Sequence, residues 1–439
     1  MKRGKHKILL LSAVTGVMLL SPFSASADEA EDLIELGIEQ VTEGNFEEAI
    51  SYFDQAAELD TENPEVFYGR GFCYFSLDNY DQALSEYSTA IEIYPEYADA
   101  LYGRGVCYYF MGDYEMTAAD LSEALNLNAE DFAAYYWRGS SYYDMELFTE
   151  ALSDFSDFIE LSPDVADGYY WRGLCNLELD DTEQAVADFS EFLEVYPDDA
   201  YGLYWRGYSQ YYLGYYTQAI LDLSKVSEFA PDNADAFYWR GRAYLADESF
   251  SQSISDFTKV IEINPEDYLA LYWRGYGYFR LGSYDVAINE FTKVVEINPE
   301  DIDALYWRGR CYNFLNDYDQ AMAEFTRVIE LNPDDADALY WRGSSSGSLG
   351  NFTDAIADYT RAIEINPDDI DAFFWRGYCN GMLENFDQAI SDLSFAIELD
   401  PEYADAYYIR SQIYEYTGDT ARSEEDYAKA IELDSGLAQ

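Results

Sequence analysis

The sequence predicts an all-α protein in which pairs of helices repeat and stack into a solenoid. The triplet Trp-Arg-Gly occurs eight times at intervals of 34 residues, from residues 137–139 to residues 375–377. Proline keeps the same interval from Pro163 to Pro401. Between these prolines lie two apolar-periodic segments of about 14 residues, joined by a short turn that often contains glycine. A fixed period of this length is typical of stacked supersecondary units.

The unit that spans residues 336–369 shows which residues define the repeat. Gly343, Ala355, Tyr359 and Pro367 stand at positions 8, 20, 24 and 32 of its 34 residues. This arrangement of small and aromatic residues before a closing proline resembles the tetratricopeptide repeat (TPR) family.

The resemblance extends over twelve units, from residue 30 to residue 437. It implies a right-handed α-solenoid, or superhelix, of twelve helix–turn–helix units, with a concave groove lined by the first helix of each unit. In this family the groove holds partners. A single solenoid domain is therefore expected over residues 28–439.

Residues 1–27 are predicted to be a secretory signal peptide. A basic start over residues 2–7 precedes an apolar run over residues 8–20, and Ala25-Ser26-Ala27 supplies a small-x-small cleavage site. The apolar run is too short to span a bilayer, so we expect cleavage after Ala27 and no membrane insertion. The mature chain is expected to be secreted or periplasmic. A retained N-terminal anchor is the alternative.

The charge of the mature chain limits the partners and the chemistry. Beyond residue 27, 86 acidic residues face 21 basic ones, which gives a net charge of −65. Such a surface repels nucleic acid. The single histidine, His6, lies in the predicted signal peptide, so histidine-based catalysis and metal ligation are excluded from the mature chain. No nucleophile–base pair, phosphate loop or metal-ligand set appears, and we predict neither an enzyme nor a cofactor. Acid-rich turns such as Asp334-Asp335 would bind divalent cations only weakly, because no ligand loop has defined spacing.

Two columns of the repeat carry opposite charges. Position 7 is arginine and position 23 is acidic in the same eleven units, whereas the first unit has Leu36 and Tyr52. We interpret the columns as a structural ladder of partly buried ion pairs between helices, with independent surface charges as the alternative. The sequence does not decide whether a pair forms within a unit or across a boundary. The central pairs are Arg138 with Asp154, Arg172 with Asp188, Arg206 with Asp222, Arg240 with Asp256, Arg274 with Glu290, and Arg308 with Glu324.

All five cysteines occupy position 10, where other units place small residues such as Ser141 or Ala243. Equivalent positions in neighbouring units should lie about 8–10 Å apart, beyond the distance of about 7 Å that a disulfide tolerates between Cα atoms. We therefore expect buried, unpaired thiols.

Positions 2, 5, 9, 12 and 13 of the first helix point to one side, which the resemblance assigns to the groove. Position 5 is tyrosine in ten units, and tyrosine suits peptide recognition, although many of these rings would also serve packing between helices. Position 6 is tryptophan in units four to eleven. This stripe either interlocks successive helices or stacks on sugar rings.

Three arginines fall at groove positions of units seven, eight and nine, namely Arg242, Arg280 and Arg310. They are predicted to converge as a dock for a carboxylate in an otherwise acidic groove. The alternative is that each arginine stacks on a neighbouring tyrosine or pairs with an acid such as Asp303. The predicted partner-binding groove comprises Tyr238, Arg242, Tyr272, Tyr276, Arg280, Tyr306 and Arg310.

These features predict a secreted or periplasmic scaffold that binds a protein or peptide partner in its groove. The alternative is a structural or carbohydrate-binding component of an extracellular assembly, which would use the Trp and Tyr stripes.

Overall fold

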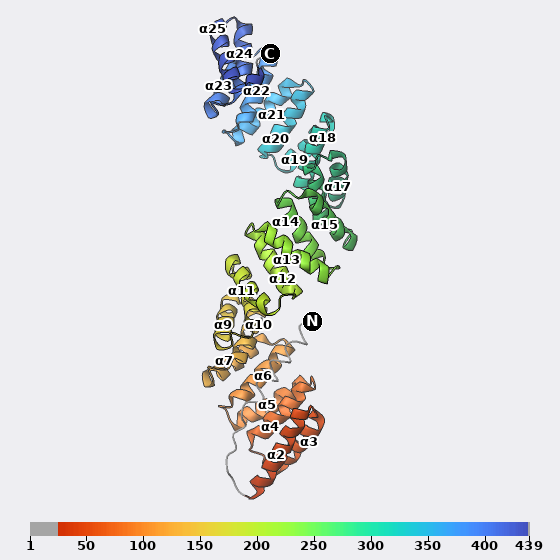
Figure 1. The fold of residues 1–439 in the computed structure, drawn as a ribbon, viewed down its shortest axis with the longest axis vertical. Coiled ribbons are helices and arrows are strands. Elements are labelled where there is room, and N and C mark those ends of the chain that lie inside the picture. Colours follow the sequence, from red (N-terminus) through yellow and green to blue (C-terminus); the bar gives the residue numbers. More distant parts are fainter. Residues whose placement is uncertain (1–24, 438–439) are drawn as a thin grey trace. The chain divides into compact units, whose positions relative to one another are not determined.

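The computed structural model describes residues 25–437, and within that range it contains 24 α-helices, a final 3-10 turn (η1, Ser435–Leu437) and no strand. The helices form consecutive helix–turn–helix pairs (Figure 1), which confirms the predicted all-α TPR solenoid. The predicted signal peptide lies outside the described residues, except that α2 begins at Ala25.

The chain divides into two compact units, with a boundary between Ala230 and Pro231. The N-terminal unit contains twelve of the described helices. They are α2 (Ala25–Glu43), α3 (Phe46–Leu59), α4 (Pro64–Ser76), α5 (Tyr80–Ile93), α6 (Ala98–Met111), α7 (Tyr114–Leu127), α8 (Phe132–Asp144), α9 (Phe148–Leu161), α10 (Asp167–Glu178), α11 (Thr182–Val195), α12 (Ala200–Tyr212) and α13 (Tyr216–Phe229).

The C-terminal unit contains the other twelve described helices. They are α14 (Ala234–Ala246), α15 (Phe250–Ile263), α16 (Tyr268–Arg280), α17 (Tyr284–Ile297), α18 (Ile302–Phe314), α19 (Tyr318–Leu331), α20 (Ala336–Ser348), α21 (Phe352–Ile365), α22 (Ile370–Met382), α23 (Phe386–Leu399), α24 (Ala404–Thr417) and α25 (Thr420–Leu433).

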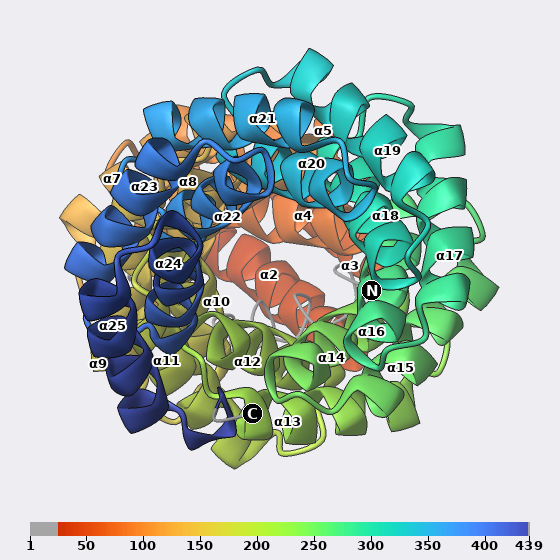
Figure 2. The same ribbon diagram turned by 90° about the horizontal axis from the view of Figure 1, so that it is seen from above.

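The even-numbered helices are the first helices of the repeats and the odd-numbered ones are the second. Within each unit the first helices lie on the inner side and the second helices on the outer side (Figure 2). Neighbouring first helices contact one another, as α4 does α6 and α16 does α18. We call the inner side of each unit its first-helix face.

Glycine at position 8 allows the two helices of a repeat to approach closely around the aromatic ring at position 24. A Cβ atom on Gly173 would lie 2.9 Å from the ring of Phe189, and one on Gly309 would lie 2.9 Å from that of Phe325. Both rings are fully buried. Burial of such large apolar rings supplies much of the stability of each repeat.

Capping residues explain where the first helices begin. The side chain of Asp301 accepts a hydrogen bond from the backbone N–H of Ala304 at 2.9 Å, and Asp335 caps Ala338 in the same way at 2.9 Å. These acids satisfy N–H groups that have no partner inside the helix, and they favour its positive end. The acids at these two turns therefore serve the fold.

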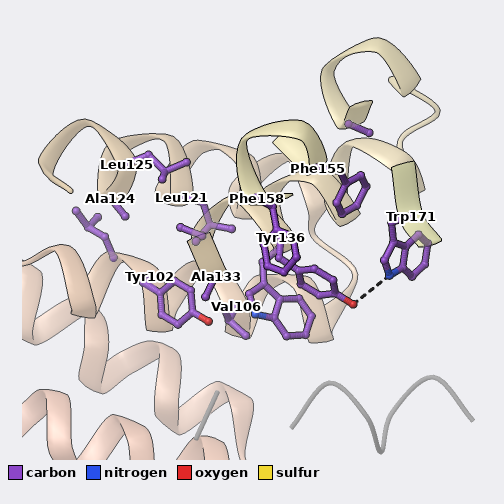
Figure 3. Close-up of a cluster of buried hydrophobic side chains, with 14 of the residues drawn as sticks. Tyr102, Val106, Leu121, Ala124, Leu125, Ala133, Tyr136, Phe155, Phe158 and Trp171 are labelled. Atoms are coloured by element: carbon purple, nitrogen blue, oxygen red, sulfur yellow. Dashed lines mark hydrogen bonds between the residues drawn. The ribbon is translucent and has the colours of Figure 1, made fainter. Parts of the chain in front are cut away.

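The core of the N-terminal unit shows how successive first helices interlock (Figure 3). The indole N–H of Trp171 donates to the hydroxyl of Tyr136 at 3.1 Å, across one repeat boundary. Trp137 is fully inaccessible to solvent and Trp171 is buried. At these positions the tryptophan stripe therefore packs the stack and offers no open ring for a sugar.

The cysteine prediction is confirmed, since all five thiols are buried and none forms a disulfide. Burial raises the pKa of the Cys379 thiol to about 11 and that of Cys311 to about 12. The thiols therefore stay protonated and act as small packing groups.

Candidate functional site

Each position-7 arginine pairs with the acid of its own repeat, sixteen residues later. Arg138 shows the geometry: its Nε donates to Oδ2 of Asp154 at 2.8 Å and its Nη2 donates to Oδ1 at 2.7 Å. The guanidinium thus binds the carboxylate through two parallel hydrogen bonds, the strongest arrangement for this pair of groups. The same partners meet in the other repeats: Arg70 with Glu86, Arg104 with Asp120, Arg172 with Asp188, Arg206 with Asp222, Arg240 with Asp256, Arg274 with Glu290, Arg308 with Glu324, Arg342 with Asp358, Arg376 with Asp392, and Arg410 with Asp426.

A hydroxyl group of the preceding repeat completes most of these pairs. Nη1 of Arg138 donates to Oγ of Ser122 at 3.0 Å, while that hydroxyl donates to the carbonyl of Ala118 at 2.6 Å. The hydroxyl hydrogen is thereby occupied, so its lone pairs face the arginine. Equivalent bonds join Arg104 to Ser88, Arg206 to Ser190, Arg274 to Thr258, Arg308 to Thr292, Arg342 to Thr326, Arg376 to Thr360, and Arg410 to Ser394.

This hydroxyl column, position 25, was missed by the sequence reasoning although the sequence contains its signal. Position 25 is Ser or Thr in units two to eleven. The first unit has Asp54, which pairs with Arg70 at 2.7 Å, and the last has Ala428. The ladder therefore acts both within and between repeats.

Burial opposes ionisation of two ladder carboxylates, Asp154 and Asp256. It raises the pKa of Asp154 more than the hydrogen bonds from Arg138 lower it, and the same holds for Asp256 beside Arg240. The hydrogen bond to Asp120 raises the pKa of Arg104, so this guanidinium keeps its charge.

On the first-helix face of the C-terminal unit, the position-5 tyrosines are half-buried. The rings of Tyr272 and Tyr306 each pack edge-on against the position-24 ring of their own repeat, with centroids 5.9 Å apart. Burial, together with the carboxylate of Asp371, raises the pKa of Tyr340 to about 12. These hydroxyls therefore stay protonated and offer both a donor and an acceptor.

Two of the three predicted groove arginines share one arrangement, which we call the arginine–tryptophan stack. The guanidinium of Arg310 lies 3.9 Å from the ring centroid of Trp341 in the next repeat, and Nη1 donates to the hydroxyl of Tyr306 at 3.2 Å. Arg242 lies 3.9 Å from the centroid of Trp273 and donates to Tyr238 at 3.4 Å. The stacks lie two repeats apart, on α18 and α14.

The third arginine is placed differently. Arg280 is the last residue of α16. It pairs with Glu248 at 3.1 Å and lies 4.6 Å from the ring centroid of Phe250. Both partners lie where α14 turns into α15. Arg280 also donates to Tyr276 at 3.3 Å. Among the described residues, no acidic side chain forms an ion pair with more than one of the three guanidinium groups. Stacking on tryptophan and phenylalanine, and the pairing with Glu248, were not foreseen.

The described residues contain no group of three or more His, Cys, Asp or Glu side chains placed to hold a metal ion. None of the helices in the described range combines the length and the apolar character that a membrane span needs.

Comparison with protein families finds one repeat type throughout the chain. A tetratricopeptide repeat model matches residues 138–200, 176–234, 204–268, 240–302 and 383–438. Related tetratricopeptide repeat models match residues 40–89 and 278–342, 98–131, 336–369 and 358–391. No protein of curated function matches the chain.

Several solved structures are similar to parts of the chain. YrrB, described as a TPR protein with an unusual peptide-binding site, is 28% identical over 42% of this chain and 95% of its own, with a TM-score of 0.38. MamA from Desulfovibrio magneticus is 21% identical over 39% of this chain and 96% of its own, with a TM-score of 0.38. A tetratricopeptide repeat protein from Parabacteroides merdae is 19% identical over 57% of this chain and 99% of its own, with a TM-score of 0.40.

Proposed function

The chain belongs to the tetratricopeptide repeat family, and we propose that it is a secreted or periplasmic scaffold that binds a protein or peptide partner on the first-helix face of its repeats. The fold is typically a non-catalytic scaffold. The proposal therefore concerns recognition rather than chemistry.

The observation that carries this proposal is the composition of the first-helix face between α14 and α20. Half-buried tyrosines are anchored there by packing against the core, and their polar edges alternate with the two arginine–tryptophan stacks. Anchored aromatic rings lose little conformational entropy when a partner binds, so they suit interface hot spots. The second helices, by contrast, carry charges such as Lys259 and Arg361, each already paired with an acid three residues later.

Photo-crosslinking from single positions tests where a partner binds. A photoreactive phenylalanine analogue replaces Tyr276 on the first-helix face in one variant and Arg361 on the outer side in the matched control. The proteins are exposed to the native extracellular fraction and then irradiated. We expect a discrete crosslinked protein from position 276 and none from position 361. Crosslinking only from position 361, or equally from both, would place the partner elsewhere.

The proposed location outside the cytoplasm rests on the signal-peptide pattern of residues 1–27. Amino-terminal sequencing of the protein from its native source tests it, and we expect the mature chain to begin at Asp28. Recovery of the uncleaved chain from the cytoplasmic fraction would contradict this part of the proposal.

A further inference from the structure

One tryptophan of the stripe has an open ring. All eight tryptophans lie in the described range, and Trp375 is the most accessible, with 38% of its surface exposed, whereas the other seven are buried or half-buried. The indole is nevertheless held in place, because its N–H donates to the hydroxyl of Tyr340 in the preceding repeat. The ring of Tyr378, on the same helix, packs edge-on against it with the centroids 5.7 Å apart. Trp375 therefore presents a fixed and open aromatic face.

The face is open because the preceding repeat has only small residues beside it. Trp307 shows the covered arrangement. Tyr276 and Phe279, at positions 9 and 12 of the repeat before it, each lie 4.9 Å from its ring, centroid to centroid. Before Trp375, position 9 is Ser344 and position 12 is glycine. The hydroxyl of Ser344 donates to the tyrosine at position 24 of its own repeat, so neither residue covers the indole.

The neighbouring repeat boundary shows which group fits such an indole. Arg310 stands at position 9 before Trp341, and its guanidinium lies 3.9 Å from the centroid of that ring. One repeat later, Ser344 takes the place of this arginine. Within residues 25–437, no guanidinium of the chain lies over Trp375. The open face is therefore the place of an arginine that the chain itself does not supply.

The charges around this place favour a cation. Burial raises the pKa of Tyr340, and the carboxylates of Asp371 and Asp369 raise it further, so both acids lie near the hydroxyl that holds the indole. Arg310 acts on the same hydroxyl in the opposite direction. Two carboxylates thus stand against one guanidinium here, in a mature chain whose net charge is −65. Such surroundings attract a cation and repel an anion.

We propose that Trp375 is a recognition site for an arginine side chain of the partner, whose guanidinium stacks on the open indole as Arg310 does on Trp341. The inference rests on the proposed function and gives the chemistry of one contact. A guanidinium suits this place better than an ammonium, because it is planar and weakly hydrated, and it stacks on a ring while its edge still donates hydrogen bonds. Asp371, one helical turn before Trp375, supplies an acceptor on the same side of α22.

Fluorine NMR of the mature chain labelled with fluorotryptophan tests this inference. The eight tryptophans give separate signals, and the loss of one signal in Trp375→Phe assigns it. The probes are Gly-Ser-Arg-Ser-Gly and the same peptide with citrulline, which has the shape of arginine without its charge. We expect the arginine peptide to shift the Trp375 signal saturably, with a dissociation constant of about 1–10 mM. The citrulline peptide should bind about tenfold more weakly, since it lacks the cation–π contact.

A double variant places the chain's own arginine on the site. Ser344→Arg with Tyr359→Phe copies the neighbouring repeat, which has Arg310 and Phe325 at the same two positions. The new guanidinium should cover Trp375 and abolish the response to the arginine peptide. Tyr359→Phe alone controls for the lost hydroxyl and should respond like the wild type. Circular dichroism confirms that each variant is folded before binding is compared.

Ser391→Arg is the control for the added charge. It places an arginine at an exposed position of α23, and it should bind the arginine peptide like the wild type. Equal binding of the arginine and citrulline peptides, full binding by the double variant, or a Trp375 signal that neither peptide moves up to about 20 mM would overturn the inference. A Trp375 signal that responds to a neutral oligosaccharide and to neither peptide would also overturn it.

The crosslinking at position 276 does not depend on Trp375. A partner captured there while the Trp375 signal stays unmoved would leave the proposed function intact and remove only the arginine contact.

Discussion

Arg308 and Arg310 stand two residues apart on α18, yet their side chains meet opposite surroundings. Arg308 donates to both oxygens of Glu324, at 2.8 and 2.9 Å, and to the hydroxyl of Thr292 at 3.1 Å. Arg310 lies on the ring of Trp341 and donates to the hydroxyl of Tyr306. Both arginines have a buried Nε without an acceptor, but Arg308 is paired with Glu324, whereas no described carboxylate lies within ion-pair distance of Arg310. The surroundings of an arginine, rather than its position on a helix, decide whether it serves structure or recognition.

The two kinds of arginine also differ in how often they recur. The ladder appears in eleven repeats, so it is a property of stacking itself. Position 9 is arginine only in the repeats of α14 and α18. A feature confined to two repeats adds nothing that the other repeats need for folding. It is therefore suited to specificity.

The largest expected effect is the loss of a ladder arginine. Arg308→Leu leaves the buried Glu324 without its bidentate partner and with the half-exposed Arg327, 4.0 Å away, as a weaker one. We expect a loss of about 3–5 kcal/mol in the free energy of unfolding, measured by urea denaturation with far-UV circular dichroism.

The matched control for this loss is the double change Arg308→Leu with Glu324→Leu. It should recover most of the stability, because replacing a buried ion pair by apolar residues of similar size is often close to neutral. If Arg308→Leu lowers the free energy of unfolding no more than an ordinary surface substitution does, the ladder is solvated. Arg308 and Arg310 would then not differ in their structural role.

The fold was predictable from the sequence because it depends on side chains that every repeat must share. Gly343 and Tyr359 belong to one helix pair, so their offset alone encodes their contact. The pairing of Arg308 with Glu324 was open, because a helix pair and a repeat boundary offer acids at similar distances. The role of the Thr292 hydroxyl was missed because a serine or threonine on a helix surface is ordinarily expected to face water.

The groove geometry was harder to predict than the ladder because it depends on curvature. Whether Arg280 points toward Arg310 or toward the turn at Glu248 is set by the rotation between neighbouring repeats. That rotation results from the packing of whole helices and leaves no local pattern in the sequence.

The second prediction concerns the pH dependence of stability. It compares a carboxylate of the ladder with a carboxylate on the first-helix face. Burial raises the pKa values of Asp154 on the ladder and of Asp99 on the face. A raised pKa means that the folded state binds the proton more tightly than the unfolded state. The resulting stability is present below the ordinary carboxyl pKa and is lost as pH rises through the folded value. Asp419, whose pKa is lowered by Arg422, opposes the trend.

Stability is therefore expected to increase as the pH falls from neutral toward the ordinary carboxyl range, seen as a higher melting temperature in calorimetry. The Asp99→Asn variant should be more stable than the wild type at the higher pH and should depend less on pH. A melting temperature that falls over this range would mean that favourable ion pairs outweigh the burial of carboxylates.

The third prediction isolates the hydroxyl that links one repeat to the next. Ser122 and Ser156 occupy the same repeat position, and each donates to the carbonyl four residues earlier. Only Ser122 also accepts from the arginine of the next repeat, since in the described structure Arg172 makes no such bond to Ser156. Ser122→Ala should therefore cost about 1 kcal/mol more than Ser156→Ala in the free energy of unfolding. Equal losses would confine the ladder to single repeats.

The smallest expected effect is the one on which the comparison depends most. Arg310→Gln removes a cation–π contact worth about 0.5–2 kcal/mol, but it also removes an enclosed guanidinium whose Nε has no acceptor. Because these terms oppose each other, we expect the free energy of unfolding to change by less than about 1 kcal/mol, measured by urea denaturation beside Arg308→Leu. The two variants lie on one helix and each removes one positive charge, so long-range electrostatics changes almost equally in both. A loss for Arg310→Gln as large as that for Arg308→Leu would show that the stack on Trp341 is a structural contact, and the charge would then not be available to a ligand.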